Sequence, residues 1–122
     1  MQPNKIDISV VIPLYNEYES LPHDIVRWGN YTDTADEGDD YLCSISYAVD
    51  ADGVIYVLDA VYSREPMEVT EQQVAEMLVR SQVRSALVES NNGGRGFARA
   101  VQRLVPRIKV DWFHQSANKE SR

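Results

Sequence analysis

The segment 86–99 constrains the fold of this chain more than any other stretch. Residues 86–88 are all apolar, which is typical of a strand buried in a sheet, and the run ends on the carboxylate of Glu89. Asparagines and glycines occupy 91–94, and a helical pattern of apolar residues begins at Phe97. A buried strand that turns through glycines into a helix is typical of an α/β protein. Spacing alone leaves open whether Glu89 presents a ligand group at the sheet edge or only ends its strand and caps the helix.

Three stretches ahead of this segment have the patterns of strands. Residues 25–33 are rich in β-branched and aromatic side chains. In 41–49 the side chains alternate with a period of two, which predicts a second strand with one face more buried than the other. Asp50–Gly53 has the composition of a turn, and 54–62 supplies the next strand. We therefore expect the second and third strands to form an antiparallel hairpin.

Two helices and a last strand complete the predicted order. Thr70 and Gln73 have the spacing of a capping box at the start of a helix. The helix that contains Phe97 ends at Pro106, which cannot continue it, and 108–112 alternates as a final strand. The order of these elements is β-β-β-α-β-α-β with right-handed crossovers. That order is compatible with a ribonuclease-H-like α/β fold built on a mixed five-stranded sheet.

Two acids follow strands that this fold would bring together. In such a sheet the first strand is central and pairs in parallel with the strand after the first helix, so Asp33 and Glu89 would emerge side by side. Carboxylate oxygens are the ligands that Mg²⁺ and Mn²⁺ prefer. Two such ions about 3.5–4 Å apart can activate water and stabilise the leaving oxygen of a phosphodiester. Asp36, Asp39 and Asp40 either extend this site or form a solvated acidic turn.

Composition narrows the class of protein. The chain has 122 residues, 43% hydrophobic and 25% charged, as expected of one globular domain with a core. Its net charge of −7 argues against nucleic-acid binding through an overall positive field, but not against an enzyme that holds metal ions with carboxylates. The single cysteine, Cys43, excludes an internal disulfide, and we expect it in the core. No apolar run is long enough to span a membrane, so we expect a cytoplasmic protein.

The first residues have a character of their own. A β-prone run, 6–13, leads into the loop Leu14–Glu17. Together they resemble the start of family 2 glycosyltransferases, in which a Val-Ile-Pro-Leu-Tyr-Asn-Glu segment helps to seat the sugar nucleotide. The resemblance ends near residue 22, and Asp50–Asp52 is better interpreted as a turn than as the acidic metal motif of that family. We therefore expect residues 1–24 to be a heterologous segment that adds a strand, and 25–122 to be the main domain.

From about residue 25 the chain resembles the C-terminal nuclease domain of phage terminase large subunits, the proteins that drive DNA packaging. The matching segments are Tyr31–Asp36, Gly38–Tyr41, Tyr56–Asp59, Glu89–Arg99 and Trp112–Ser116. The resemblance implies an endonuclease that cuts double-stranded DNA with Mg²⁺ or Mn²⁺. By this resemblance Asp33 and Glu89 would be its metal-binding catalytic acids. From the acidic turn, apart from the resemblance, we expect Asp39 as a further metal ligand.

Contacts with DNA are expected from the segment after Glu89. Arg95 and Arg99 lie in the first turns of the predicted helix, whose N-terminus attracts phosphate. We expect them, together with Asn91, to contact DNA. Arginines exposed on a helix surface without any such role are the alternative.

Two features of the family are missing from this sequence. In the family a third metal-binding acid lies on a later helix, in a segment that does not occur in this sequence. An ATPase domain with a Walker loop precedes the nuclease in the family, and no Walker loop occurs in this sequence either. We expect a truncated or fused fragment with weak or no activity alone. In an intact protein its partners would be the ATPase domain, the portal and the small terminase subunit, in a bacterial host cell. The alternatives are a glycosyltransferase fragment that uses a nucleotide sugar and a noncatalytic prophage remnant.

Overall fold

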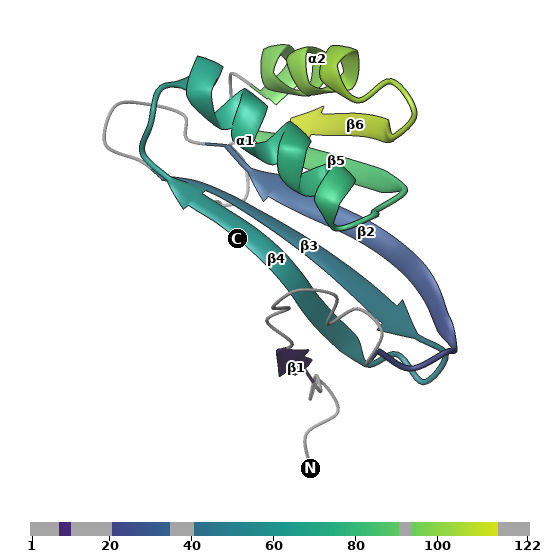
Figure 1. Ribbon diagram of the computed structural model, residues 1–122. Coiled ribbons are helices and arrows are strands. Elements are labelled where there is room, and N and C mark those ends of the chain that lie inside the picture. The colour runs from purple at the N-terminus through teal and green to yellow at the C-terminus, as the bar shows by residue number, and fades with distance from the viewer. Residues whose placement is uncertain (1–7, 11–20, 35–40, 91–93, 115–122) are drawn as a thin grey trace, which may run out of the picture.

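One sheet carries both helices of the described chain (Figure 1). The computed structural model describes residues 8–10, 21–34, 41–90 and 94–114. The elements in chain order are β1 (Ile8–Val10), β2 (Ile25–Asp33), β3 (Leu42–Asp50), β4 (Ile55–Ser63), α1 (Met67–Arg80), β5 (Ser85–Ser90), α2 (Gly94–Leu104) and β6 (Lys109–His114). None of the described helices combines the length and the apolar character that crossing a membrane requires.

The sheet has six strands in the order β1-β4-β3-β2-β5-β6. β2, β3 and β4 form an antiparallel meander, while β5 runs parallel to β2 and β6 parallel to β5. The predicted order of elements and the central place of the first long strand are therefore confirmed. β1 pairs in parallel with Ile55–Val57 at the start of β4, which confirms the extra N-terminal strand.

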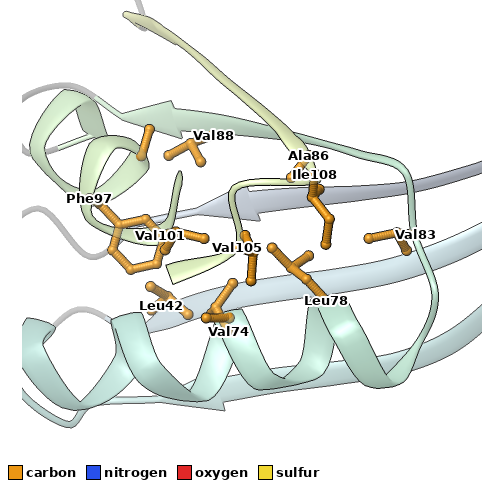
Figure 2. Close-up of a cluster of buried hydrophobic side chains, with 12 residues drawn as sticks. Leu42, Val74, Leu78, Val83, Ala86, Val88, Phe97, Val101, Val105 and Ile108 are labelled. Carbon is orange, nitrogen blue, oxygen red and sulfur yellow. The ribbon is translucent and has the colours of Figure 1, made fainter. Parts of the chain in front are cut away.

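The core fills the space between the two helices and one face of the sheet. Buried apolar side chains come from α1, α2 and the strands beneath them, and Figure 2 shows Phe97 and Val101 of α2 facing Leu42 and Val74. Phe97 has an exposed fraction of 0%. Its truncation to alanine would lower the free energy of unfolding by about 3–5 kcal/mol, because a cavity would replace the ring. This packing fixes α2, and hence the end of β5, against the sheet.

Helix α1 begins earlier than the capping box predicts. Its first residue is Met67, and Pro66 takes the N-cap position with φ −57° and ψ 156° and no side-chain hydrogen bond. Thr70 lies inside the first turn, where its hydroxyl donates to the carbonyl of Met67 at 3.1 Å. The prediction of Thr70 as N-cap is wrong. Pro66 has the extended ψ of an N-cap, and its carbonyl accepts the first helical hydrogen bond, from the N–H of Thr70 at 3.1 Å, so the helix starts directly after it.

Candidate active site

Asp33 and Glu89 end neighbouring parallel strands. They are Cα partners in the β2–β5 register, and paired strands lie roughly 4.8 Å apart. The backbone N–H of Thr34 donates to the carbonyl oxygen of Glu89 at 3.2 Å, which ties the two strand ends together. Asp33 is exposed and Glu89 half-buried. The predicted juxtaposition of the two acids is therefore present in the structure.

Both carboxylates lie on the face of the sheet opposite α1 and α2, which we call the open face. Their neighbours Thr32 and Val88 are buried, and Val88 belongs to the core beneath the helices. Because side chains alternate along a strand, Asp33 and Glu89 point the other way. Successive Cα pairs across the sheet define an acid row on this face, consisting of Tyr62, Cys43, Asp33, Glu89 and Phe113. The two acids occupy its middle.

Tyr31 holds the carboxylate of Glu89 from the neighbouring strand. Its hydroxyl donates a hydrogen bond to Oε1 of Glu89. Its ring meets Phe113 edge to face, with centroids 6.5 Å apart. Burial, then the hydrogen bond and charge of Glu89 and the charge of Asp33, raise the pKa of Tyr31 to about 12. The phenol therefore stays protonated at neutral pH and remains a donor.

A ladder of buried polar side chains lies beneath the acids on the helix side of the sheet. The Nδ2 atom of Asn30 donates to the hydroxyls of Ser44 at 2.9 Å and Ser46 at 3.2 Å. The Thr32 hydroxyl donates to Oδ1 of Asn30 at 2.8 Å and lies 2.8 Å from the Ser44 hydroxyl. Slipping β2 against β3 by one residue would leave these groups unsatisfied. The ladder thus fixes the register that places Asp33.

The sequence interpretation missed both Tyr31 and the ladder. Tyr31 lies two residues before Asp33, so the alternation of β2 already puts it on the face of the acid. Its contact with Glu89 depends on the β2–β5 register, which sequence spacing does not give. The ladder leaves a signal only as polar residues at alternate positions of two paired strands, Asn30 with Thr32 and Ser44 with Ser46.

Helix α2 follows the strand that carries Glu89 and exposes arginines to solvent. Arg95 and Arg99 are exposed, and Arg103 continues the spacing of four residues. Residues four apart lie on one side of a helix, so the three guanidinium groups form a basic stripe. Arg103 was not predicted, although the same spacing would have found it. Asp39 and Asn91 lie outside the described residues.

The fold has counterparts among solved structures. No protein-family model matches the sequence, and no curated protein matches it. The nuclease domain of the large terminase subunit gp2 of bacterial virus Sf6 is similar, with a TM-score of 0.62, 13% identity, and coverage of 82% of this chain and 43% of that one. The g2p (large terminase) nuclease domain from bacteriophage SPP1 with bound Mn has a TM-score of 0.56 and 15% identity, over 93% of this chain and 61% of that one.

A ribonuclease is similar as well. RNase HII from Archaeoglobus fulgidus, in its complex with PCNA, has a TM-score of 0.50 and 14% identity, over 75% of this chain and 65% of that one. The chain has a ribonuclease-H-like fold. It spans less than half of the Sf6 domain, 43%, and under two thirds of the SPP1 domain, 61%. These likenesses favour the ribonuclease-H-like interpretation over the glycosyltransferase alternative.

Cys43 is not a core residue of this ribonuclease-H-like sheet. It is half-buried on the open face, and its Cα pairs with that of Asp33. The prediction failed because the more buried face of β3 is the one that carries its small polar residues and the ladder. Burial, and then the charge of Asp33, raise the pKa of Cys43. Its thiol is therefore uncharged at neutral pH and adds no further negative charge beside Asp33 and Glu89.

A second acidic group lies at the opposite end of the ribonuclease-H-like sheet. Carboxylate oxygens of Asp24, Asp50 and Asp52 lie within 4.8 Å of one another. Asp50 already accepts bonds from the N–H groups of Asp52 and Val54, both at 2.9 Å, and from the Tyr56 hydroxyl at 3.0 Å. These bonds close the β3–β4 turn, as the turn interpretation predicts, and with the Val54 bond as the main cause they lower the pKa of Asp50. Asp50 thus has a structural role in the hairpin.

Proposed function

We propose that this chain is a divalent-metal-dependent endonuclease domain that hydrolyses phosphodiester bonds in double-stranded DNA. The observation that carries the proposal is the in-register pair of Asp33 and Glu89 on the open face of the sheet. The likeness in fold to terminase nuclease domains, one of them with bound Mn, supports it.

The donor set suits Mg²⁺ or Mn²⁺. Both ions prefer oxygen ligands, and Mg²⁺ in particular is commonly held by one or two carboxylates while it keeps several waters. Asp33 and Glu89 would hold the ion, with Asp39 as a proposed further ligand. Two such ions held there would supply a metal-activated water as nucleophile and positive charge that stabilises the leaving oxygen of the phosphodiester. The part of the chain itself is to fix the carboxylates, with Tyr31 orienting Glu89.

The proposed DNA contacts come from α2. Arg95 and Arg99, with Asn91 before them, would bind the phosphate backbone, and Arg103 extends the same stripe. Phosphate contacts fix the position of a duplex without reading its sequence. Because the net charge of the chain is −7, attraction to DNA phosphates has to come from a local basic surface such as this stripe.

The wider context is also proposed. Residues 25–122 would be the nuclease domain of a DNA-packaging terminase that works with an ATPase domain, a portal and a small terminase subunit, with residues 1–24 as a separate segment. Among the described residues, Asp24, Asp50 and Asp52 form a group of three side chains that could hold a metal ion, whereas Asp33 and Glu89 belong to no such group of three. We therefore propose that cleavage by this chain alone is weak.

The decisive experiment measures Mn²⁺ binding by calorimetry. The parent chain is expected to bind Mn²⁺, and Asp33→Asn is expected to abolish binding because a neutral amide replaces a charged ligand. Asp52→Asn makes the same change in the other acidic group and is expected to leave this binding intact. Equal Mn²⁺ affinity in the parent and in Asp33→Asn would overturn the proposal.

Nicking of supercoiled plasmid DNA in Mn²⁺ supplies a second readout. Any nicking by the parent is expected to disappear in Glu89→Gln. A folded parent chain that binds no Mn²⁺ and nicks no DNA would favour the noncatalytic alternative.

A further inference from the structure

A stacked pair of tyrosines lies next to the acid row. The rings of Tyr41 and Tyr62 are 4.5 Å apart with an interplanar angle of 8°. The guanidinium carbon of Arg64 lies 5.3 Å from the centroid of the Tyr41 ring. Tyr62 is 68% exposed and Tyr41 44%. A large part of the Tyr62 ring is therefore accessible to solvent even though it stacks on a neighbour.

The register places this pair on the open face, near the acids. Tyr62 is the Cα partner of Cys43, and Cys43 is the Cα partner of Asp33. Two strand spacings, roughly 10 Å, therefore separate the backbones of Tyr62 and Asp33. An unpaired base within a few nucleotides of a phosphate at Asp33 would therefore reach Tyr62.

The chemistry of the pair suits an unpaired nucleobase. Every base has a π face, and stacking on an aromatic side chain tolerates any sequence. Inside a duplex these faces are covered by the neighbouring base pairs, so bases away from the duplex ends stack on a protein ring only when they are unpaired. Arg64 adds a positive charge beside the rings, which attracts the phosphates that accompany the base.

We propose that Tyr41, Tyr62 and Arg64 form a stacking platform for an unpaired base of a nucleic-acid strand that runs across the open face. The part of this proposal that sets the stacked base next to a cleaved phosphate rests on the proposed nuclease function. The binding of unpaired bases is independent of that function, because it requires neither a metal ion nor the two acids. The stacking platform gives the chain a preference for frayed or single-stranded segments beside the acid pair.

The test measures binding of the full chain to labelled oligothymidylate of about twelve nucleotides by fluorescence anisotropy in EDTA. Loss of one stacking ring is expected to weaken binding roughly tenfold in Tyr62→Ala. Tyr62→Phe keeps the ring and is expected to stay within about twofold of the parent. Trp112→Ala is the matched control, since Trp112 is 41% exposed but pairs with Val88 and so lies on the helix side of the sheet. It is also expected to stay close to the parent.

A blunt duplex of the same length separates stacking from backbone contact. Tyr62→Ala is expected to leave duplex affinity unchanged. Equal losses for the single strand and the duplex would overturn the proposal, as would a Tyr62→Ala affinity equal to that of the parent or a parent that binds no oligothymidylate. Circular dichroism melts of each variant confirm that the exposed substitution leaves the fold intact.

Asp33→Asn distinguishes this inference from the nuclease proposal. In EDTA it is expected to bind oligothymidylate as the parent does. If neither the parent nor any variant binds Mn²⁺ but Tyr62→Ala loses affinity for the single strand, the stacking platform is supported and the nuclease proposal is refuted. If Mn²⁺ binding depends on Asp33 but Tyr62→Ala binds oligothymidylate as the parent does, the nuclease proposal is supported and the stacking platform is refuted.

Discussion

The hydroxyl of Tyr31 on β2 donates a hydrogen bond to the carboxylate of Glu89 on β5. Tyr31 lies on the same face as Asp33, two residues along the same strand. β2 therefore supplies one acid, Asp33, and also the hydroxyl that orients the acid of β5, Glu89. Such outer contacts fix the direction of a ligand's lone pairs before any ion arrives.

Tyr31→Phe is expected to weaken Mn²⁺ binding about tenfold, because Glu89 would lose the donor that orients it. Calorimetry on the parent and the variant measures the change. Tyr47→Phe removes a hydroxyl from another tyrosine of the open face, the Cα partner of Gly29, and should leave Mn²⁺ affinity unaltered. Equal affinities for Tyr31→Phe and the parent would show that Tyr31 does not position Glu89.

Arg95→Gln and Arg99→Gln are each expected to weaken binding to duplex DNA for all sequences alike. Each change removes one phosphate contact, so the slope of log affinity against log salt concentration should fall by about 1. Titrations of a labelled duplex at several salt concentrations give that slope. Arg27→Gln on β2 is the control, since this exposed arginine lies near the opposite end of the strand from Asp33. A salt slope that stays at the parent value would refute the phosphate role.

Asn30→Ala is expected to lower the free energy of unfolding by about 1–3 kcal/mol, because the buried hydroxyls of Ser44, Ser46 and Thr32 would lose their hydrogen bonds to its amide. Urea denaturation measures this loss. Asn30 is 2% exposed, so water cannot readily replace its amide. A loss below about 0.5 kcal/mol, the usual range of surface substitutions, would mean that the ladder does not hold the register.

Asp50→Asn is expected to lower the melting temperature at neutral pH. Hydrogen bonds to Asp50 hold its pKa below the ordinary value. Its contribution is therefore complete above the pKa of the unfolded state, about 3.9, and is lost as the pH falls through the lower folded pKa. The difference between parent and variant should shrink below about pH 4 in thermal melts. Asp52→Asn is the control. A difference that persists unchanged at low pH would contradict this role.

Local patterns were sufficient for the order of the elements. The period of two in 41–49 and the apolar run 86–88 predicted β3 and β5, and the β-β-β-α-β-α-β order placed β2 between them, as observed. The same order predicted that Asp33 and Glu89 would be neighbours. This inference worked because parallel pairing of two strands brings their C-terminal ends to the same edge.

The features of the site that the sequence patterns did not predict depend on contacts between strands. The bond from Tyr31 to Glu89 requires the exact register, and the burial of polar Ser44 and Ser46 requires the amide of Asn30 on another strand. The tendency of a free cysteine to be buried led us to expect Cys43 in the core, but the structure has it half-buried on the open face. Asp39 and Asn91 stay predictions, since they lie outside the described residues.

The place of β1 at the outer edge of the sheet bears on which part of the sequence the fold constrains least. β1 joins the fold by pairing its backbone with Ile55–Val57 of β4. Main-chain hydrogen bonds between strands are formed by N–H and C=O groups that every residue except proline carries. The backbone pairing of this outermost strand therefore depends little on its side chains, whereas the central strands must also carry the acids and the ladder.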